Sequence, residues 1–351
     1  MSVPSVGQAA TDTSFVRNEP LRVRWGRRAI TVPVLFSLLA LYLLLLPVLI
    51  PVAIAADLFR RRSWIMIRCG AFFGWYLLVE CVTVVVIALA WTLRILRPGL
   101  LHARFVHWNW VIQKNWSHAL YRGAMRLFSL TTRVDGDTCV RTGPLIIFMR
   151  HVSMADTILP LVLIGVRHEI LLRYVLKSEL LWDPPIDIAG QVLPNVFVRR
   201  GSGDGERETA LVRALAHDLG PSEGVVIYPE GTRFTPEKRE KIIASIIKRD
   251  PASAVAAAAR ALKNLLPVHP GGPMVLLDAN EGADVAFCGH VGLEGTTHLR
   301  DFLNGALLGS TLRVKFWRVP FTEIPKDPDA RTMWLYDWWQ RVDQWIGEQS
   351  R

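Results

Sequence analysis

The stretch LIIFMRHVSMAD, residues 145–156, decides the fold prediction. Its first four residues are apolar, which is typical of a short strand buried on both faces of a sheet. A histidine and an aspartate follow where this strand would end, and α/β sheets bind ligands at the carboxyl ends of their strands. The stretch therefore predicts a buried strand with a functional loop directly after it.

Similar apolar runs recur along the chain and alternate with helix-like segments. Residues 224–228 (GVVIY) form a second predicted strand, followed by the turn Pro229-Glu230-Gly231-Thr232-Arg233. Further strands are expected at 171–176, 273–277, 285–291 and 312–319, and helices near 154–166, 206–219, 252–264 and 330–347. This order favours the α/β class, with a mixed, largely parallel sheet covered by helices.

Composition narrows the class of protein. The chain has 351 residues, 51% of them hydrophobic and 21% charged, which excludes a disordered or collagen-like chain and makes a purely water-soluble protein doubtful. The net charge of +10 suits an anionic partner. Because the basic residues are scattered and form no nucleic-acid-binding motif, we expect lipid or a phosphorylated substrate and no nucleic acid. The four cysteines lack the spacing of a zinc site or a secreted disulfide framework, which indicates a reducing compartment.

Two long apolar stretches near the N-terminus predict a membrane hairpin. Residues 31–55 contain no charged residue, and residues 69–93 contain only Glu80, which we expect to have a polar partner. Each is long enough for a hydrocarbon core of roughly 30 Å. A cleaved signal peptide is the alternative for the first stretch, but that stretch is too long and a second follows at once.

Arginines complicate the topology of this hairpin. Basic clusters lie before it, in its connecting loop and after it: Arg22, Arg24, Arg27 and Arg28; Arg60, Arg61 and Arg62; Arg94 and Arg97. Two true crossings would put one cluster outside, against the positive-inside rule. A hairpin that dips into one leaflet removes this conflict and is the arrangement we favour, with the polar domain on the cytoplasmic face.

The expected organisation has four parts. Residues 1–29 form a polar, basic N-terminal tail and residues 30–97 the membrane hairpin. Residues 98–134, rich in tryptophan and basic groups, form linker helices at the membrane interface or, as an alternative, packed on the next domain. Residues 135–351 form the catalytic domain.

The loop after the first predicted strand offers acid–base chemistry. Asp156 could accept the Nδ1–H of His151, which would leave Nε2 to take a proton from a hydroxyl group. Ser153 is an alternative nucleophile, but it lacks the surrounding G-x-S-x-G motif. In the second loop, Thr232 and Arg233 offer donors for a phosphate, although a surface ion pair would also explain the arginine.

Together these residues resemble a known family, the PlsC-type glycerolipid acyltransferases, whose best-known members are 1-acyl-glycerol-3-phosphate acyltransferases. The resemblance rests on His151-x4-Asp156 followed by Glu230-Gly231-Thr232-Arg233. Weaker family blocks occur in the right order and bring the resemblance to roughly residues 100–345: Val175 to Leu180 with Lys177, Phe197-Val198-Arg199-Arg200, and Leu265-Leu266-Pro267 with Gly271-Gly272.

The resemblance implies acyl transfer from acyl-CoA or acyl carrier protein to 1-acyl-glycerol-3-phosphate, giving phosphatidic acid. His151 would be the general base and Asp156 would orient it, without an acyl-enzyme, metal or cofactor. The implied phosphate-binding set is Arg200 and Arg233, with Glu230 and Gly231 shaping the pocket and Thr232, Arg199 and Lys177 beside it. The alternatives are an acyltransferase for a different lysophospholipid or lipid intermediate, and a Ser/His/Asp lipid hydrolase. The oligomeric state stays open.

Three positions depart from the family pattern. Arg150 stands where many members have asparagine, and Arg199 replaces an acidic residue. His269 stands where longer members often have arginine. The departures leave the catalytic pair intact and bear on the identity of the acceptor.

Overall fold

A seven-stranded sheet with the order β1-β7-β6-β2-β5-β3-β4 forms the centre of the protein. The computed structural model describes residues 19–61, 63–97, 99, 101–199, 205–294 and 299–349. The strands are β1 (Thr131–Asp135), β2 (Leu145–Met149), β3 (Leu171–Lys177), β4 (Val196–Val198), β5 (Glu223–Ile227), β6 (Asp284–Val291) and β7 (Thr311–Val319). Neighbours are parallel except β6 and β7, which are antiparallel. The predicted mixed, largely parallel sheet is confirmed.

Strand β2 is buried on both faces, as its apolar run predicts. Ile146 and Phe148 contact one core cluster, while Leu145, Ile147 and Met149 contact the cluster on the opposite face. This alternation follows from the two-residue period of a strand. Because β5 and β6 flank β2 on its two sides, the loops after these central strands lie close together.

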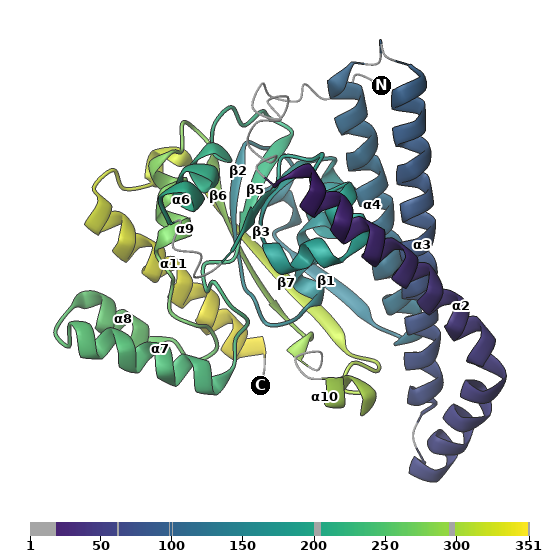
Figure 1. Ribbon diagram of the computed structural model, residues 1–351. Helices are drawn as coiled ribbons and strands as arrows, with labels where there is room; N and C mark the ends of the chain where they lie inside the picture. Colours follow the sequence, from purple (N-terminus) through teal and green to yellow (C-terminus); the bar gives the residue numbers. More distant parts are fainter. Residues whose placement is uncertain are drawn as a thin grey trace.

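Helices cover both faces of the sheet (Figure 1). The first core cluster includes residues of α6 (Gly205–Ala214), α8 (Ala254–Ala261), α9 (Gly271–Asp278) and α11 (Pro328–Gln349), and α7 (Pro236–Arg249) packs beside α8. The other long helices are α2 (Leu21–Arg60), α3 (Ile65–Leu96) and α4 (His102–Leu127), and the short ones are α5 (Pro184–Ile188) and α10 (Leu299–Leu303). Figure 1 shows α3 and α4 on the side of the sheet away from α11.

One expectation about local structure is wrong and another needs refinement. Residues 273–277, predicted as a strand, lie in helix α9, because a short apolar run buried on several sides does not distinguish strand from helix. The predicted helix near 154–166 is present but irregular: a 3₁₀ turn at Ala155–Thr157 precedes a helical segment over 159–168 that contains a π-helical turn at Leu161–Val166. The tryptophans of α11 pack on the domain, and Trp338 stacks on Phe287.

Helices α2 and α3 form the expected hairpin, joined by a short connection. Both are long and apolar enough to cross a membrane by length and composition. They contact each other around Leu35, Leu77, Cys81 and Val84. No residue of the most apolar window of α2 is buried, so this surface is available to lipid. Figure 1 shows α2 crossing α3 and bending beyond the crossing, and its second half contains Pro47 and Pro51.

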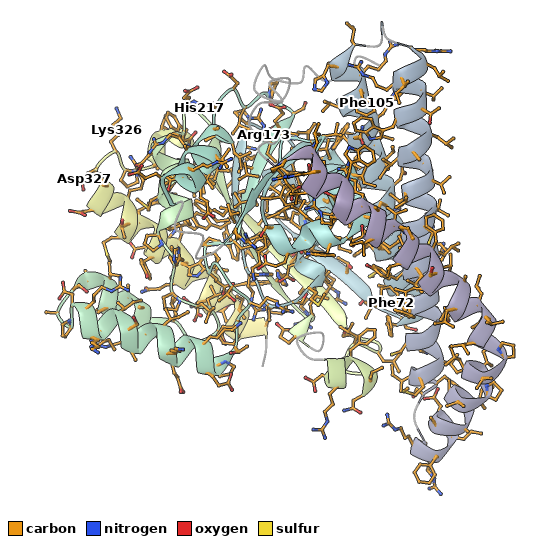
Figure 2. The ribbon with its side chains drawn as sticks, in the orientation of Figure 1. Phe72, Phe105, Arg173, His217, Lys326 and Asp327 are labelled. Carbon is orange, nitrogen blue, oxygen red and sulfur yellow. The ribbon has the colours of Figure 1, made fainter. Side chains whose placement is uncertain are left out.

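The α3–α4 pair packs along the α/β domain. Near the start of α3, Ile65 and Cys69 lie in one apolar cluster with Phe302 of α10, and near its end Ala90 lies in another with Leu171 of β3. Phe72 and Phe105, labelled in Figure 2, lie toward opposite ends of this helix pair. The side chain of Glu80 is buried and accepts a hydrogen bond from Trp116 Nε1 at 2.8 Å, so it has the expected partner.

Two arginines of the basic cluster before the hairpin form ion pairs with the α/β domain. Arg27 Nη2 lies 2.6 Å and Arg28 Nε 2.7 Å from the buried carboxylate of Asp187. Two of the arginines expected at lipid headgroups therefore bind α5. Helix α2 begins at Leu21 and strand β1 at Thr131, on the N-terminal side of the expected limits at 30 and 135. Trp110 and Trp116 of α4 are buried in the protein.

Candidate active site

The loop after β2 places His151 beside Asp156. The distance from His151 Nδ1 to Asp156 Oδ2 is 3.1 Å, and a short 3₁₀ turn, Ala155–Thr157, carries the aspartate back toward the histidine. The His151 side chain retains 16% of its exposure, whereas that of Asp156 is fully buried. Because an ionised carboxylate only accepts hydrogen bonds, His151 donates from Nδ1, and in the neutral ring Nε2 is then the nitrogen that can accept a proton.

Asp156 is held by several donors besides His151. Its Oδ2 accepts the backbone N–H groups of Val152 at 2.6 Å and Ser153 at 2.8 Å, and its Oδ1 accepts the Ser153 hydroxyl at 2.9 Å. Burial alone would raise the pKa of Asp156, but His290, His151 and the Ser153 backbone outweigh it and hold this pKa below its usual value. The orienting group therefore stays charged.

Two residues that follow β5, Tyr228 and Glu230, form hydrogen bonds to the loop after β2. The Tyr228 hydroxyl donates to the carbonyl of Asp156 at 2.7 Å, and its ring centroid lies 4.6 Å from that of His151. Glu230 Oε2 accepts the backbone N–H of His151 at 2.6 Å, and its Oε1 accepts that of Leu266 at 3.0 Å. Burial raises the pKa of Glu230 to about 8. The His151 motif, the Glu230-Gly231-Thr232-Arg233 motif and the Leu265-Leu266-Pro267 segment thus meet at one carboxyl group.

A cavity of about 490 Å³ opens beside His151. Its lining is apolar along β3, β5 and α6, through Val175, Leu176, Val212 and Ile227. Polar and basic groups also line it: His151, Lys177, Arg233 and His269. Such a cavity suits an amphiphilic molecule, with an apolar chain along one part of the lining and an anionic group at the cations.

Four of the nine predicted site residues line this cavity. Lys177, Gly231 and Arg233 line it with His151. Glu230 and Asp156 lie behind the lining and act through hydrogen bonds to the loop. Thr232 accepts a hydrogen bond from Lys238 Nζ at 3.2 Å and does not line the cavity.

Of the two arginines predicted after β4 to bind phosphate, the structure describes only Arg199. Arg199 is exposed and does not line the cavity, and its backbone N–H donates to Glu208 Oε1 at 3.0 Å. Arg200 lies outside the described residues. Arg233 is half-buried, and within the described ranges its guanidinium has no hydrogen-bond or ion-pair partner, so its donors are available to a ligand.

Sequence reasoning did not single out Tyr228 or His290. Tyr228 lies two residues before the Glu230-Gly231-Thr232-Arg233 motif, and its position at the end of an apolar strand was the available signal. His290 ends a predicted strand, but only the pairing of β6 with β2 shows that it reaches Asp156. Among the residues that the structure describes, no group of three or more His, Cys, Asp or Glu side chains is arranged to hold a metal ion.

One of the comparisons with known proteins, the family model, agrees with the sequence motifs. The family model described as Acyltransferase matches residues 131–275, from β1 into α9. The chain is also similar to the crystal structure of the 1-acyl-sn-glycerophosphate (LPA) acyltransferase PlsC from Thermotoga maritima. That match has 12% sequence identity and a TM-score of 0.44, and covers 77% of this chain and 96% of that one. None of the curated proteins matches the chain.

Proposed function

We propose that this chain, whose residues 131–275 match the Acyltransferase family model, transfers a fatty acyl group from a thioester to 1-acyl-glycerol-3-phosphate, giving phosphatidic acid. The donor is acyl-CoA or acyl carrier protein. The observation that carries the proposal is the pairing of His151 with buried Asp156 at the wall of a cavity that also contains Arg233.

The chemistry needs a base and a leaving-group acid, and His151 can supply both. Nε2 takes the proton of the acceptor hydroxyl as its oxygen attacks the thioester carbonyl carbon. When the resulting tetrahedral intermediate collapses, the carbon–sulfur bond breaks and the imidazolium returns the proton to the thiolate. Asp156, held ionised by its donors, stabilises the imidazolium between these two steps. No bond to the enzyme forms.

The cations of the cavity support a phosphorylated acceptor. Arg233 offers several N–H donors that suit a phosphate, and Lys177 adds a second positive charge to the lining. The apolar part of the lining suits the acyl chain that donor and acceptor both carry. A lysolipid with a phosphodiester headgroup is the second candidate acceptor, since it also presents an anionic phosphate.

The geometry of Ser153 argues against the hydrolase alternative. Its hydroxyl donates to Asp156 Oδ1 at 2.9 Å and accepts the Ala155 N–H at 3.1 Å, and the residue is fully buried. A serine nucleophile needs a base at its own hydroxyl and access to the substrate. Ser153 instead serves to hold Asp156.

Membrane association through a dipping hairpin forms part of the proposal. The second half of α2 is apolar and exposed, whereas α3 contacts the catalytic domain from Ile65 to Ala90. A perpendicular α3 crossing would carry that domain into the hydrocarbon, where its exposed polar groups would lose their water. We therefore propose that α2 enters one leaflet and that the cavity faces the cytoplasm.

Acyl transfer by the purified chain tests the function. Oleoyl-CoA and acyl carrier protein are offered as donors with lysophosphatidic acid, lysophosphatidylglycerol and lysophosphatidylcholine as acceptors. We expect phosphatidic acid from the first acceptor, and a loss of about 10²- to 10⁴-fold in His151→Ala. Product from another lysolipid alone would move the acceptor, and unchanged activity of His151→Ala would reject the mechanism.

A further inference from the structure

A second histidine reaches the catalytic aspartate from the neighbouring strand. His290 lies near the end of β6, which pairs with β2 up to Met149 and Cys288. Its Nε2 lies 3.4 Å from Asp156 Oδ1 and 3.2 Å from the backbone carbonyl of Arg150. The side chain is fully buried and does not line the cavity, so His290 cannot itself touch a substrate there.

The surroundings of His290 determine which ring nitrogen carries the proton. Both groups near Nε2, a carboxylate and a carbonyl, only accept hydrogen bonds, so Nε2 must be the donor. Nδ1 is buried and has no hydrogen-bond partner within the described part of the chain. A second proton on Nδ1 would therefore be a buried, unsatisfied donor, which makes the neutral ring the stable form.

The charges around His290 agree with a neutral ring. Burial is the main influence and lowers the pKa of His290, and the nearby Arg150 guanidinium lowers it further. Asp156 and Glu294 act in the opposite direction but do not reverse the result. Arg150 is itself paired with Glu294 at 2.6 Å and donates to the carbonyl of His290, so its charge is partly balanced.

We propose that His290 is a positioning residue for acyl transfer, fixing Asp156 so that Oδ2 stays on His151. This inference rests on the proposed function. The carboxylate is held at both oxygens: His151 and two backbone N–H groups bind Oδ2, and the Ser153 hydroxyl binds Oδ1. The Nε2 of His290, which donates to the Arg150 carbonyl, lies against Oδ1 at 3.4 Å and closes the space into which the carboxylate would turn away from His151. Through the Arg150 carbonyl, His290 also holds the residue before the base.

Paired substitutions separate positioning from folding. His290→Leu removes the donor, whereas His290→Gln keeps an N–H₂ group near the place of Nε2. We expect His290→Leu to lower kcat by about 10- to 100-fold with the KM of both substrates little changed, and His290→Gln to restore most of the loss. His168 is a matched control because its Nε2 lies 3.1 Å from Asp137 away from the cavity, and its Leu and Gln variants should keep the kcat of the unmodified chain.

A spectroscopic measurement tests the inference without acyl transfer. In the full chain labelled with ¹⁵N-histidine, the Nδ1–H resonance of His151 reports its bond to Asp156, and we expect it to shift or broaden in His290→Leu and to recover in His290→Gln. An unmodified chain that transfers no acyl group to any acceptor would reject the proposed function, and the resonance alone would then decide the role of His290. A folded His290→Leu with unchanged His151 resonance, or with the kcat of an active unmodified chain, would overturn the inference.

Discussion

The carboxyl group of Glu230 accepts the backbone N–H of His151 at 2.6 Å. The motif that begins at Glu230 therefore acts on the His151 motif through the main chain of His151. The other oxygen accepts the N–H of Leu266 at 3.0 Å. The family resemblance implies that Glu230 shapes the phosphate pocket. Its 3% exposure and these two bonds indicate that Glu230 acts indirectly, by holding the main chain of His151 in place at the cavity wall.

Replacing Glu230 by glutamine should impair both activity and folding. Glutamine has one acceptor oxygen, and its amide N–H₂ would face one of the two backbone donors. Losing a buried hydrogen bond costs about 1–3 kcal/mol, so we expect kcat to fall by about 10-fold or more and the melting temperature to fall as well. The control is Glu240→Gln on the exposed face of α7, and equal kcat values for the two variants would contradict this role of Glu230.

Glu230 should also give the stability of the protein a characteristic pH dependence. Burial raises its pKa from 4.5 to about 8. Between these values the folded protein keeps a proton that the unfolded chain has released, so the free energy of unfolding decreases as the pH rises through this window. The unfolding free energies of the unmodified chain and Glu230→Gln, measured across the window, should differ most at its acid end. A constant difference would show that Glu230 does not titrate in this way.

Ser153→Ala distinguishes an acyltransferase from a serine hydrolase. The alanine variant loses one hydrogen bond to Asp156 Oδ1 but keeps His151 and the backbone donors of Oδ2. We expect the stability to fall by about 1–2 kcal/mol and acyl transfer to fall by less than about 10-fold. Acyl transfer and release of free fatty acid are measured side by side. Loss of all turnover in a variant that still folds would favour Ser153 as the nucleophile.

The sheet was predictable where strands are buried on both faces. The runs at 145–148 and 224–228 are apolar throughout and correspond to β2 and β5. The run at 273–277 is equally apolar but forms part of α9, since its environment, and not its pattern, decides between helix and strand. Strand β4 has only three residues, Val196–Val198, which is too short for a two-residue period to stand out.

The site was predictable in its members and less so in their arrangement. Their placement directly after a predicted buried strand singled out His151 and Asp156, and the five-residue separation within one loop brings them together. The sequence could not show that Glu230 binds the main chain of His151. The two residues are 79 positions apart, and only the pairing of β2 with β5 brings them together. His290 reaches Asp156 only through the order of the sheet, with β6 beside β2, which no local pattern encodes.

Arg233 should affect binding of the acceptor more than turnover. Its guanidinium lines the cavity and has no partner among the described residues, so its removal should not disturb the fold. We expect Arg233→Ala to raise the KM for lysophosphatidic acid by about 10- to 100-fold, with a smaller effect on kcat and none on the donor KM. Exposed Arg313, bonded to Gln349, is the control for loss of one positive charge. A rise in the donor KM alone would assign Arg233 to the phosphates of the donor.

Asp187 should hold the membrane hairpin on the catalytic domain. Its fully buried carboxylate binds Arg27, Arg28 and Gln191, and α5, which contains it, follows the segment with Leu180 at the cavity wall. Asn has one acceptor oxygen and no charge, so Asp187→Asn would leave the largely buried Arg28 without a counter-ion and Arg27 with Glu19 as its only charged partner within the described residues. Breaking a buried pair costs about 3–5 kcal/mol, and we expect a clearly lower melting temperature and faster proteolysis at the start of α2.

The matched control for this prediction is Asp278→Asn. Asp278 also pairs with an arginine, Arg331, but its own side chain is 42% exposed. A partly exposed pair contributes about 0–1 kcal/mol, so this variant should melt close to the unmodified chain and resist protease to the same extent. If Asp187→Asn instead behaved like Asp278→Asn in detergent and in vesicles, the arginine pair would not hold α2. The contacts between α2 and α3 around Leu35 and Leu77 would then have to keep the hairpin in place by themselves.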